Sequence, residues 1–342
     1  MLYLLVAMVG ALIPTAVYVL FIYWLDRYEK EPLSLLGLAF LWGAFPAAFL
    51  SVLTEVAFDI PIAALGAETL TANLLSVSLS APLVEESLKG IALIGLALVF
   101  QREFDDVLDG IIYGAMIGFG FAFTENFAAY FLPILSQEGI GAGAANIFLR
   151  TIVFGFNHAF WTGILGAAVG YARLSNDRRQ RLVAPILGWM LAVALHSIHN
   201  TGATLVQQTS CLSLVVSFTV DWGGFFLLLA IAYLVLRKER GWLERGLVEE
   251  VRKGTLTPQE YLLLCSPGQR FWARWHAWGR GGWPAYHQVG RYFQCATELA
   301  FKKQHLRSLG DESGNLAEIH RLQEQLAAIR LQAWPWLWPP QP

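Results

Sequence analysis

Two neighbouring carboxylates, Glu85 and Glu86, interrupt a stretch of sequence, residues 74–100, that is otherwise apolar enough to cross a membrane. A charged side chain at the bilayer centre costs roughly 2.5–3.5 kcal/mol, so two adjacent ones need a physical reason. On a helix Lys89 lies one turn from both glutamates and can pair with either. Such a pair tolerates burial, but one ammonium balances only one carboxylate. The other carboxyl is then a candidate for general acid–base chemistry.

Three further polar clusters interrupt other apolar stretches, and they are Glu125-Asn126, His158, and the group His196, His199 and Asn200. His196 and Asn200 are four residues apart, so they share one face of a helix. Taken singly, such intramembrane residues are usually packing or interhelical hydrogen-bonding residues. Four clusters in one chain instead suggest a common site, with a carboxylate base, imidazoles and an amide donor. Asp221, in the last apolar stretch, either joins this site or has a structural role.

The same residue types leave metal binding open. Two histidines with neighbouring carboxylates can hold zinc. The HExxH pattern of helix-borne zinc proteases is absent, and the three cysteines lack the spacing of a zinc knuckle or a disulfide framework. We therefore favour a site without a cofactor and keep zinc as the alternative, in which case its ligands would be Glu86, His158 and His196.

Membrane-spanning helices must position these residues. The chain has 342 residues, of which 56 % are hydrophobic and 15 % are charged, whereas soluble domains carry about 25 % charged residues. Seven segments can span a bilayer: 2–25, 33–57, 74–100, 110–133, 146–172, 182–207 and 212–236. We expect an all-α, polytopic transmembrane bundle whose first helix is retained rather than cleaved. A face of small residues predicts close helix packing, and its members are Gly110, Gly114, Gly118 and Gly120.

The connectors between these segments alternate in basic content. Residues 26–32, 101–109 and 173–181 contain Lys or Arg, whereas 58–73, 134–145 and 208–211 contain neither. The positive-inside rule then places the protein in the cell membrane with its N-terminus outside and its C-terminus in the cytoplasm. In this topology four polar residues lie roughly 14–15 residues from the cytoplasmic ends of their helices, which is slightly beyond the middle of the bilayer. These four are Glu85, Glu125, His158 and His196.

The chain after residue 236 has a different composition. We divide it into a transmembrane domain, 1–236, a cytoplasmic helical region, 237–333, and a Pro/Trp-rich tail, 334–342, which is too rich in proline for a helix. Apolar residues at helical spacing predict an amphipathic helix: Leu316, Ile319, Leu322, Leu326 and Ile329. Four tryptophans lie among arginines and form either an aromatic core or a segment on the inner membrane surface: Trp272, Trp275, Trp278 and Trp283. The net charge of −2 indicates no nucleic-acid partner.

These motifs together resemble the PrsW family of intramembrane proteases, in the broader group that includes the CAAX-type prenyl-protein endopeptidases. The resemblance covers roughly residues 1–236 and rests on four patterns in order: Glu85-Glu86-x-x-Lys89, Asp109-Gly110-x-x-Tyr113-Gly114 leading to Glu125-Asn126, Phe154-x-x-x-His158, and His196-x-x-x-Asn200. The CAAX-type pattern is EExxxR, whereas this chain has Lys at position 89 and Gly at position 90. The difference favours the PrsW branch over the CAAX-type branch, and it argues against prenylated substrates.

The resemblance implies hydrolysis of a peptide bond within or beside the membrane. Glu85 or Glu86 would be the general base on a water that His158 helps to orient. His196 and Asn200 would stabilise the oxyanion. The supporting residues would be Lys89, Glu125, Asn126 and His199. The implied partner is a membrane-anchored protein substrate, such as a bacterial anti-sigma factor, in the lipid bilayer.

Two other functions are compatible with these residues. Intramembrane Glu, His and Lys also form the proton relays of transporters and channels, although the two halves of the sequence show no inverted repeat. A catalytically inactive scaffold that binds membrane partners is the third hypothesis. The complete motif set favours the protease.

Overall fold

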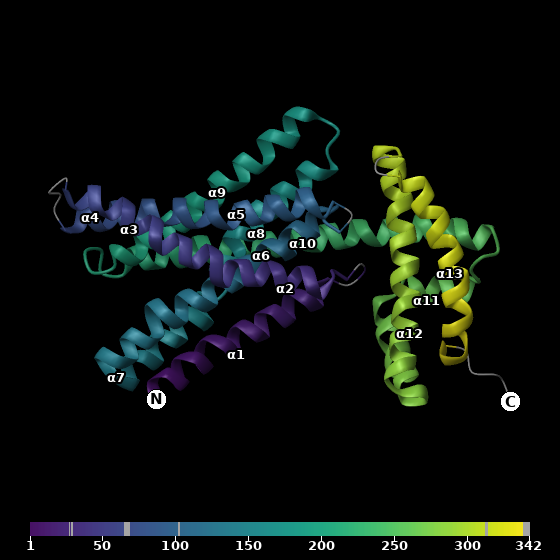
Figure 1. Cartoon of the computed structure of the whole chain (residues 1–342), viewed down its shortest axis with the longest axis horizontal. Helices are drawn as coiled ribbons and strands as arrows, with labels where there is room; N and C mark the ends of the chain where they lie inside the picture. Colours follow the sequence, from purple (N-terminus) through teal and green to yellow (C-terminus); the bar gives the residue numbers. More distant parts are fainter. Residues whose placement is uncertain (27, 29, 65–68, 102, 312–313, 338–342) are drawn as a thin grey trace. The chain divides into compact units, whose positions relative to one another are not determined.

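The computed structural model describes residues 1–26, 28, 30–64, 69–101, 103–311 and 314–337 (Figure 1). Within these ranges the chain is helical and contains no strand, which confirms the expected all-α membrane bundle. Contacts divide the chain into two compact units. Unit 1 contains Met1–Leu25 and Glu31–Ala232, and unit 2 contains Asp26–Lys30 and the chain from Tyr233 onward.

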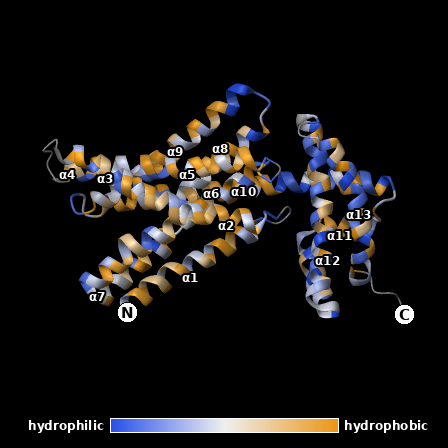
Figure 2. Ribbon diagram, viewed as in Figure 1, coloured by the Kyte–Doolittle hydropathy of each residue, from blue (hydrophilic) through white to orange (hydrophobic). Residues whose placement is uncertain are grey.

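Unit 1 contains most of the apolar helices, and hydrophobic residues cover them along most of their length (Figure 2). Its α-helices are α1 (Leu2–Leu25), α2 (Leu33–Trp42), α3 (Ala48–Ala64), α4 (Thr69–Leu75), α5 (Ala81–Val99), α6 (Val107–Glu125), α7 (Leu132–Phe148), α8 (Asn157–Leu174), α9 (Arg178–Thr204) and the first part of α10 (Leu212–Arg252). Four short π-helical segments join some of them: η1 (Gly43–Ala47), η2 (Ser76–Ser80), η3 (Asn126–Phe131) and η4 (Leu149–Val153).

Among the described residues, five helical runs are long and apolar enough to cross a membrane: Leu2–Leu25, Leu33–Ile62, Val107–Leu174, Arg178–Thr204 and Leu212–Arg252. The run Val107–Leu174 contains a break at Gly139, whose φ is 88°. The chain reverses there, since a Cβ on Gly143 would lie 2.2 Å from the Leu135 side chain. This run therefore holds two of the seven expected spans. α5 carries three charged residues and is not among the five, so the number of crossings stays a prediction.

Glycines bring α6 and α8 into close contact. A Cβ on Gly110 would lie 2.0 Å from the carbonyl oxygen of Gly166, and one on Gly118 would lie 2.3 Å from that of His158. Only hydrogen fits at these positions, because real Cβ atoms do not approach an oxygen so closely. The predicted small face is confirmed at Gly110, Gly114 and Gly118, and it sets His158 on α8 directly against the helix that leads to Glu125, whereas Gly120 packs against Phe40 of α2.

Unit 2 is a helical domain around its own core. It contains the second part of α10, α11 (Pro258–Leu264), α12 (Pro267–Leu309) and α13 (Asn315–Leu337). Thr257 and Glu260 form a capping box at the start of α11. The amphipathic pattern of α13 is confirmed at four positions, which are buried, whereas Leu316 is exposed; the four are Ile319, Leu322, Leu326 and Ile329.

One expectation for unit 2 is wrong, and one of two alternatives is excluded. α13 continues through Pro335 to Leu337, so residues 334–337 are helical; residues 338–342 lie outside the described residues. Proline removes one backbone hydrogen bond, but the Trp336 carbonyl accepts from Arg280 at 2.8 Å, and the Trp336 indole donates to Gln288 at 2.7 Å. Of the two alternatives for the four tryptophans, the aromatic core is excluded because all four are exposed, and the buried aromatic residues of α12 are instead Tyr292, Phe293 and Phe301.

Candidate active site

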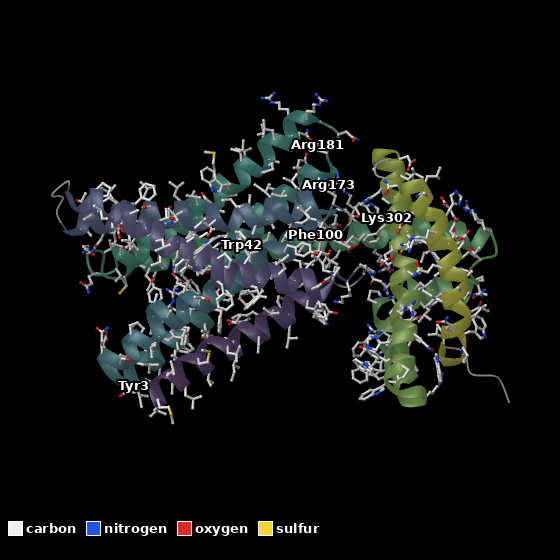
Figure 3. The ribbon with its side chains drawn as sticks, viewed as in Figure 1. Tyr3, Trp42, Phe100, Arg173, Arg181 and Lys302 are labelled. Carbon is white, nitrogen blue, oxygen red and sulfur yellow. The ribbon has the colours of Figure 1, made fainter. Side chains whose placement is uncertain are left out.

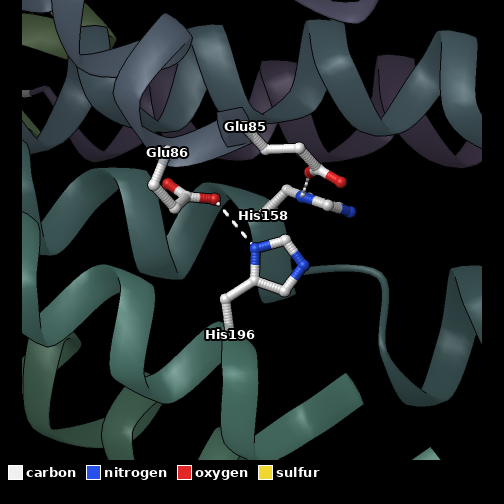
Figure 4. A group of neighbouring side chains, drawn as sticks. All are labelled: Glu85, Glu86, His158 and His196. Carbon is white, nitrogen blue, oxygen red and sulfur yellow. Dashed lines mark hydrogen bonds and ion pairs between the residues drawn. The ribbon is translucent and has the colours of Figure 1, made fainter. Parts of the chain in front are cut away.

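Four side chains from three helices converge in unit 1 (Figure 4). Glu85 and Glu86 come from α5, His158 from the first turn of α8, and His196 from α9. One oxygen or nitrogen atom from each of the four lies within 4.8 Å of those of the other three. All four side chains are buried. Residues separated by up to 111 positions in the sequence thus form one polar cluster inside an apolar bundle.

Lys89 occupies the centre of this cluster. Its Nζ lies 3.2 Å from Glu85 Oε2, 2.8 Å from Glu86 Oε1 and 2.9 Å from His158 Nδ1. The same ammonium lies 3.9 Å from the centre of the Phe121 ring, an attractive cation–π arrangement. Lys89 therefore pairs with both glutamates, whereas the helical spacing required only that it could reach either.

The two glutamates have unequal surroundings. Glu86 is fully buried; its Oε1 contacts Lys89 and lies 3.1 Å from His196 Nδ1, and its Oε2 accepts a hydrogen bond from Thr162 at 3.1 Å. Both of its oxygens are thus engaged. Glu85 contacts Lys89 and lies 3.9 Å from His158 Nδ1, and it borders a cavity. Only Glu85 of the pair faces space that a water molecule or a substrate could enter.

Glu125 connects this cluster to an arginine that the sequence analysis did not single out. Glu125 Oε2 lies 3.0 Å from His158 Nε2 and also accepts a hydrogen bond from Arg150, on η4. Arg150 donates a second hydrogen bond to the amide oxygen of Asn126, and its guanidinium lies 3.5 Å from the centre of the Tyr130 ring. A lone Arg inside an apolar segment needs a carboxylate partner, and that signal could have identified the pair.

Two cavities border the cluster. The larger has a volume of about 850 Å³ and is lined mostly by apolar residues, of which η1 and α3 supply the largest share, with carboxylates of Glu55, Glu85 and Glu125. The smaller, of about 50 Å³, is lined by His158, His196 and His199 among others. Glu125, Tyr130 and Asn200 line both. The larger cavity is within the size range of small-molecule or peptide sites.

The π-helical segments shape this space. Each of the four contributes at least one lining residue: Pro46 from η1, Val77 from η2, Tyr130 from η3 and Arg150 from η4. A π turn rotates the residues that follow it, and such turns are frequent at functional sites. Sequence periodicity does not reveal them, which is why the cavity could not be anticipated.

Two further carboxylates that line the larger cavity were also missed. Glu55 and Asp59 lie one turn apart on α3, and Asp59 accepts a hydrogen bond from Ser76 on η2. Both acids line the cavity with Glu85. The signal was present, since Glu55 lies inside an expected span, where an acid is expensive.

The remaining expected residues surround the four without joining them. His199 Nδ1 lies 2.6 Å from Asp221 Oδ2, which also accepts a hydrogen bond from Asn157 at 3.0 Å. Asp221 therefore belongs to a neighbouring network, and Asn157 is a member that the sequence analysis did not identify. The Asn200 amide donates to the Val77 carbonyl at 2.8 Å and contacts none of the four convergent side chains through a described hydrogen bond.

The donor set suits a divalent metal by type and spacing. Two imidazoles and two carboxylates are common zinc ligands, and their donor atoms converge here within 4.8 Å. Lys89 Nζ already contacts one atom each of Glu85, Glu86 and His158. An ammonium and a metal ion would compete for the same lone pairs. The four side chains can therefore stabilise a positive charge, and the ammonium of Lys89 can supply that charge in place of a metal ion.

Comparison with known proteins identifies the family to which this chain is related. Residues 31–235 match the model of the PrsW family intramembrane metalloproteases. Protease PrsW of Clostridioides difficile (strain 630) is 25 % identical over 215 residues, which cover 62 % of this chain and 85 % of the relative. Protease PrsW of Bacillus subtilis (strain 168) is 30 % identical over 162 residues, 46 % of this chain and 65 % of the relative. Protease PrsW of Geobacillus kaustophilus (strain HTA426) is 30 % identical over 185 residues, which cover 53 % of this chain and 72 % of the relative.

No solved structure matches this chain. The family match ends at residue 235, so it covers nearly all of unit 1 and almost none of unit 2. Within the matched range lie all four convergent side chains and Lys89. The chain belongs to the PrsW family and is a membrane-integral protease.

Proposed function

We propose that the chain hydrolyses a peptide bond in a membrane-anchored protein, with Glu85 as the general base that activates the attacking water. The observation that carries this proposal is the difference between the glutamates. Glu85 borders the cavity of about 850 Å³, whereas both oxygens of Glu86 are engaged by neighbouring side chains. A general base must reach the proton that it removes. Glu85 meets this requirement, and Glu86 serves as its buried partner.

In this mechanism Glu85 takes a proton from water as the water attacks the scissile carbonyl, and then returns the proton to the leaving amide nitrogen. His158 orients the water through Nδ1, which lies 3.9 Å from Glu85 and exchanges its contact with Lys89 for the water, while Glu125 fixes the other nitrogen of the ring. His196 and Asn200 stabilise the oxyanion, a large catalytic contribution where water is excluded. The Asn200 amide carries two hydrogens, and one already binds the Val77 carbonyl, so the second is available for this role.

We favour this glutamate-type mechanism over a metal-dependent one, because Lys89 already places a positive charge against three of the four convergent side chains. In the alternative, Glu86, His158 and His196 would hold a zinc ion, which when bound supplies Lewis-acid polarisation of the carbonyl. Metal analysis of the purified protein decides between them. We expect little zinc and full activity with chelators; a stoichiometric metal that is lost together with activity would overturn the preference.

The substrate that we propose is a single-span protein, of which a membrane-anchored anti-sigma factor is one example. A transmembrane helix uses its own backbone groups in hydrogen bonds, so its scissile segment must become extended to reach Glu85. The larger cavity offers room for such a segment. Phe45, Phe49 and Val52 provide an apolar wall for its side chains, and Glu55 and Asp59 provide carboxylates.

Trapping tests the proposal directly. In Glu85→Gln the cavity keeps its shape but loses the base, so the variant should retain an uncleaved substrate when it is purified from cells that co-express tagged single-span proteins. The matched control is Glu103→Gln, an exposed glutamate after α5, which should cleave and release the same protein. Normal cleavage by Glu85→Gln would refute the assignment of Glu85 as the base.

The topology that we propose has the N-terminus outside and the C-terminus in the cytoplasm. It rests on the Lys and Arg residues of alternate connectors. A reporter fused after Pro342 should be active only in the cytoplasm. A signal on the opposite side would break the topology without affecting the chemistry proposed for Glu85.

A further inference from the structure

Residues 271–286 of α12 expose large aromatic side chains. Trp272 is 62 % exposed, Trp283 63 % and Phe271 55 %, although α12 belongs to a domain with its own buried core. Six residues form this surface, which we call the α12 aromatic patch: Phe271, Trp272, Trp275, Trp278, Trp283 and Tyr286. Figure 3 shows ring-bearing side chains gathered along one side of α12. Exposed apolar patches of this kind on a soluble domain usually mark an interaction site.

The patch is continuous because α12 folds back on itself. Gly282 has a φ of 65°, which breaks the helix there. The two halves then lie together, since the Arg274 guanidinium lies 4.0 Å from the centre of the Tyr286 ring. The ring centres of Trp275 and Tyr286, which come from opposite sides of the break, lie 5.9 Å apart.

Ring contacts extend the patch in both directions from this junction. The ring centres of Trp275 and Trp278 are 4.8 Å apart. Those of Phe271 and Trp272 are 5.4 Å apart, and those of Trp283 and Tyr286 are also 5.4 Å apart. The six side chains thus form one surface rather than separate exposed residues.

The segment of sequence that carries the patch has charged side chains of a single sign. No Asp or Glu occurs between Glu260 and Glu298, whereas the same stretch contains Arg270, Arg274, Arg280 and Arg291. Arg280 and Arg291 are exposed. A surface that combines tryptophans with arginines and has no acid in its sequence complements anionic lipid headgroups.

The connection to unit 1 favours a bilayer over a soluble partner. α10 continues without a break from the apolar residues 212–236 into Arg237, Lys238 and Arg240. Unit 2 is therefore tethered to the membrane that unit 1 spans. A tether raises the effective concentration of the membrane surface near unit 2, so even a weak surface affinity suffices for docking.

We propose that unit 2 docks on an anionic lipid bilayer through the α12 aromatic patch. The rings enter the headgroup region of the same membrane that unit 1 spans, and Arg280 and Arg291 contact lipid phosphates. This function lies outside the residues that match the protease family. It does not depend on the mechanism proposed for Glu85.

Spin labelling of the full chain in proteoliposomes tests this. Gly279 is exposed and a Cβ there meets no atom within 4 Å, so Gly279→Cys carries a nitroxide beside the patch. The matched control is Ala328→Cys, on an exposed position of α13. Both are made in a Cys211→Ser background, since Cys265 and Cys295 are buried. The label's collision rates with oxygen and with a water-soluble nickel chelate report lipid or water around it.

In vesicles that contain phosphatidylglycerol we expect the Gly279 label to be lipid-accessible and the Ala328 label to be aqueous. Replacing Arg280 and Arg291 with Gln, or raising the salt concentration, should return the Gly279 label toward water, because screening weakens contacts with headgroups. Replacing Trp272 and Trp278 with Ser should do the same. An aqueous Gly279 label in these vesicles would overturn the proposal. So would dipolar broadening that disappears on dilution with unlabelled protein, because a second copy would then cover the patch.

Discussion

The charged cluster of unit 1 and one buried ion pair of unit 2 are arranged differently. In unit 1, Lys89 contacts two carboxylates and an imidazole beside a cavity of about 850 Å³. In unit 2, Glu260 is buried against one main cation, Arg330, with two N–O distances of 2.6 and 2.9 Å. Thr257 and Tyr292 donate the remaining hydrogen bonds to Glu260.

The difference shows which feature of a buried charge indicates function. Both units satisfy the general rule that buried charges are paired. Glu260 has its charge balanced and both oxygens bound, which is what a structural ion pair needs. The cluster of unit 1 keeps more carboxylates than its lysine can balance, and one of them, Glu85, borders open space. An unbalanced charge beside a cavity, rather than burial alone, distinguishes the candidate active site.

The largest expected effect separates the two units by activity. Glu85→Gln should lower the cleavage rate about 100- to 10,000-fold, because that is the usual contribution of a positioned general base. Glu260→Gln should leave the rate within about twofold of wild type. Cleavage of a tagged single-span substrate in proteoliposomes measures both. Equal losses in the two variants would show that the contrast between the units is one of stability and not of chemistry.

Within unit 1, Glu86→Gln should reduce stability as well as activity. Removing one partner of a buried ion pair costs about 3–5 kcal/mol, and Glu86 contacts Lys89, His196 and Thr162. Glu85→Gln should cost less, since Glu85 makes fewer described hydrogen bonds. Thermal unfolding in detergent compares the two variants. If both have the same midpoint as wild type, the division into a base and a buried partner is wrong.

Close packing offers a smaller but well-controlled test. Gly118→Ala places a Cβ 2.3 Å from the His158 carbonyl oxygen, and such overpacking should cost about 1–3 kcal/mol and displace His158. Gly95→Ala, on α5, meets no atom within 4 Å and should be neutral or slightly stabilising. Unfolding and cleavage are measured for each. Full activity in Gly118→Ala would mean that the spacing between α6 and α8 does not set the site.

The smallest effect concerns unit 2 and pH. Burial raises the pKa of Glu260, but Arg330 and the hydrogen bonds from Thr257 and Tyr292 lower it more, so that the net pKa lies below its usual value. A carboxyl whose pKa is lower in the folded state stabilises the folded protein at pH values above its pKa in the unfolded chain, which is about 4.3. This stabilisation disappears as the pH falls through the folded-state pKa.

We therefore expect Glu260→Gln to cost about 1–3 kcal/mol at neutral pH and less in acid. The urea midpoint, reported by a fluorophore on Ala328→Cys, is compared at about pH 6 and about pH 3. If Glu260→Gln lowers the urea midpoint by the same amount at both pH values, the charge of Glu260 does not contribute to the stability of unit 2.

The sequence predicted the local part of the candidate site well. The spacing of Glu85, Glu86 and Lys89 sufficed to infer a shared turn, because helical geometry is local. Gly118 and its neighbours indicated a tight helix pair for the same reason. The cavity could not be predicted, since it depends on π turns and on the packing of distant helices. Which glutamate borders it therefore required the structure.

The missed residues share a different reason. Arg150 binds Glu125 across the reversal at Gly139, and no local pattern links residues on the two sides of such a turn. Glu55 was overlooked because a single acid leaves the hydropathy of its segment almost unchanged. In unit 2, Pro335 argued against a helix, yet contacts to the neighbouring Trp336 stabilise the helix end. Tertiary contacts there outweigh a local preference.

Glu125 also links two residues that lie on opposite sides of a bend in the chain. Arg150 and His158 lie on either side of the irregular residues 154–156, and both bind the same carboxylate. Gly155 permits this bend, since a Cβ there would lie 2.0 Å from the Thr151 carbonyl oxygen. The angle of the His158 ring is thus set by the backbone and not by its own rotamer alone. Straightening the bend would break the link between the imidazole and the guanidinium through Glu125, and Lys89 would then be the remaining described partner of the His158 ring nitrogens.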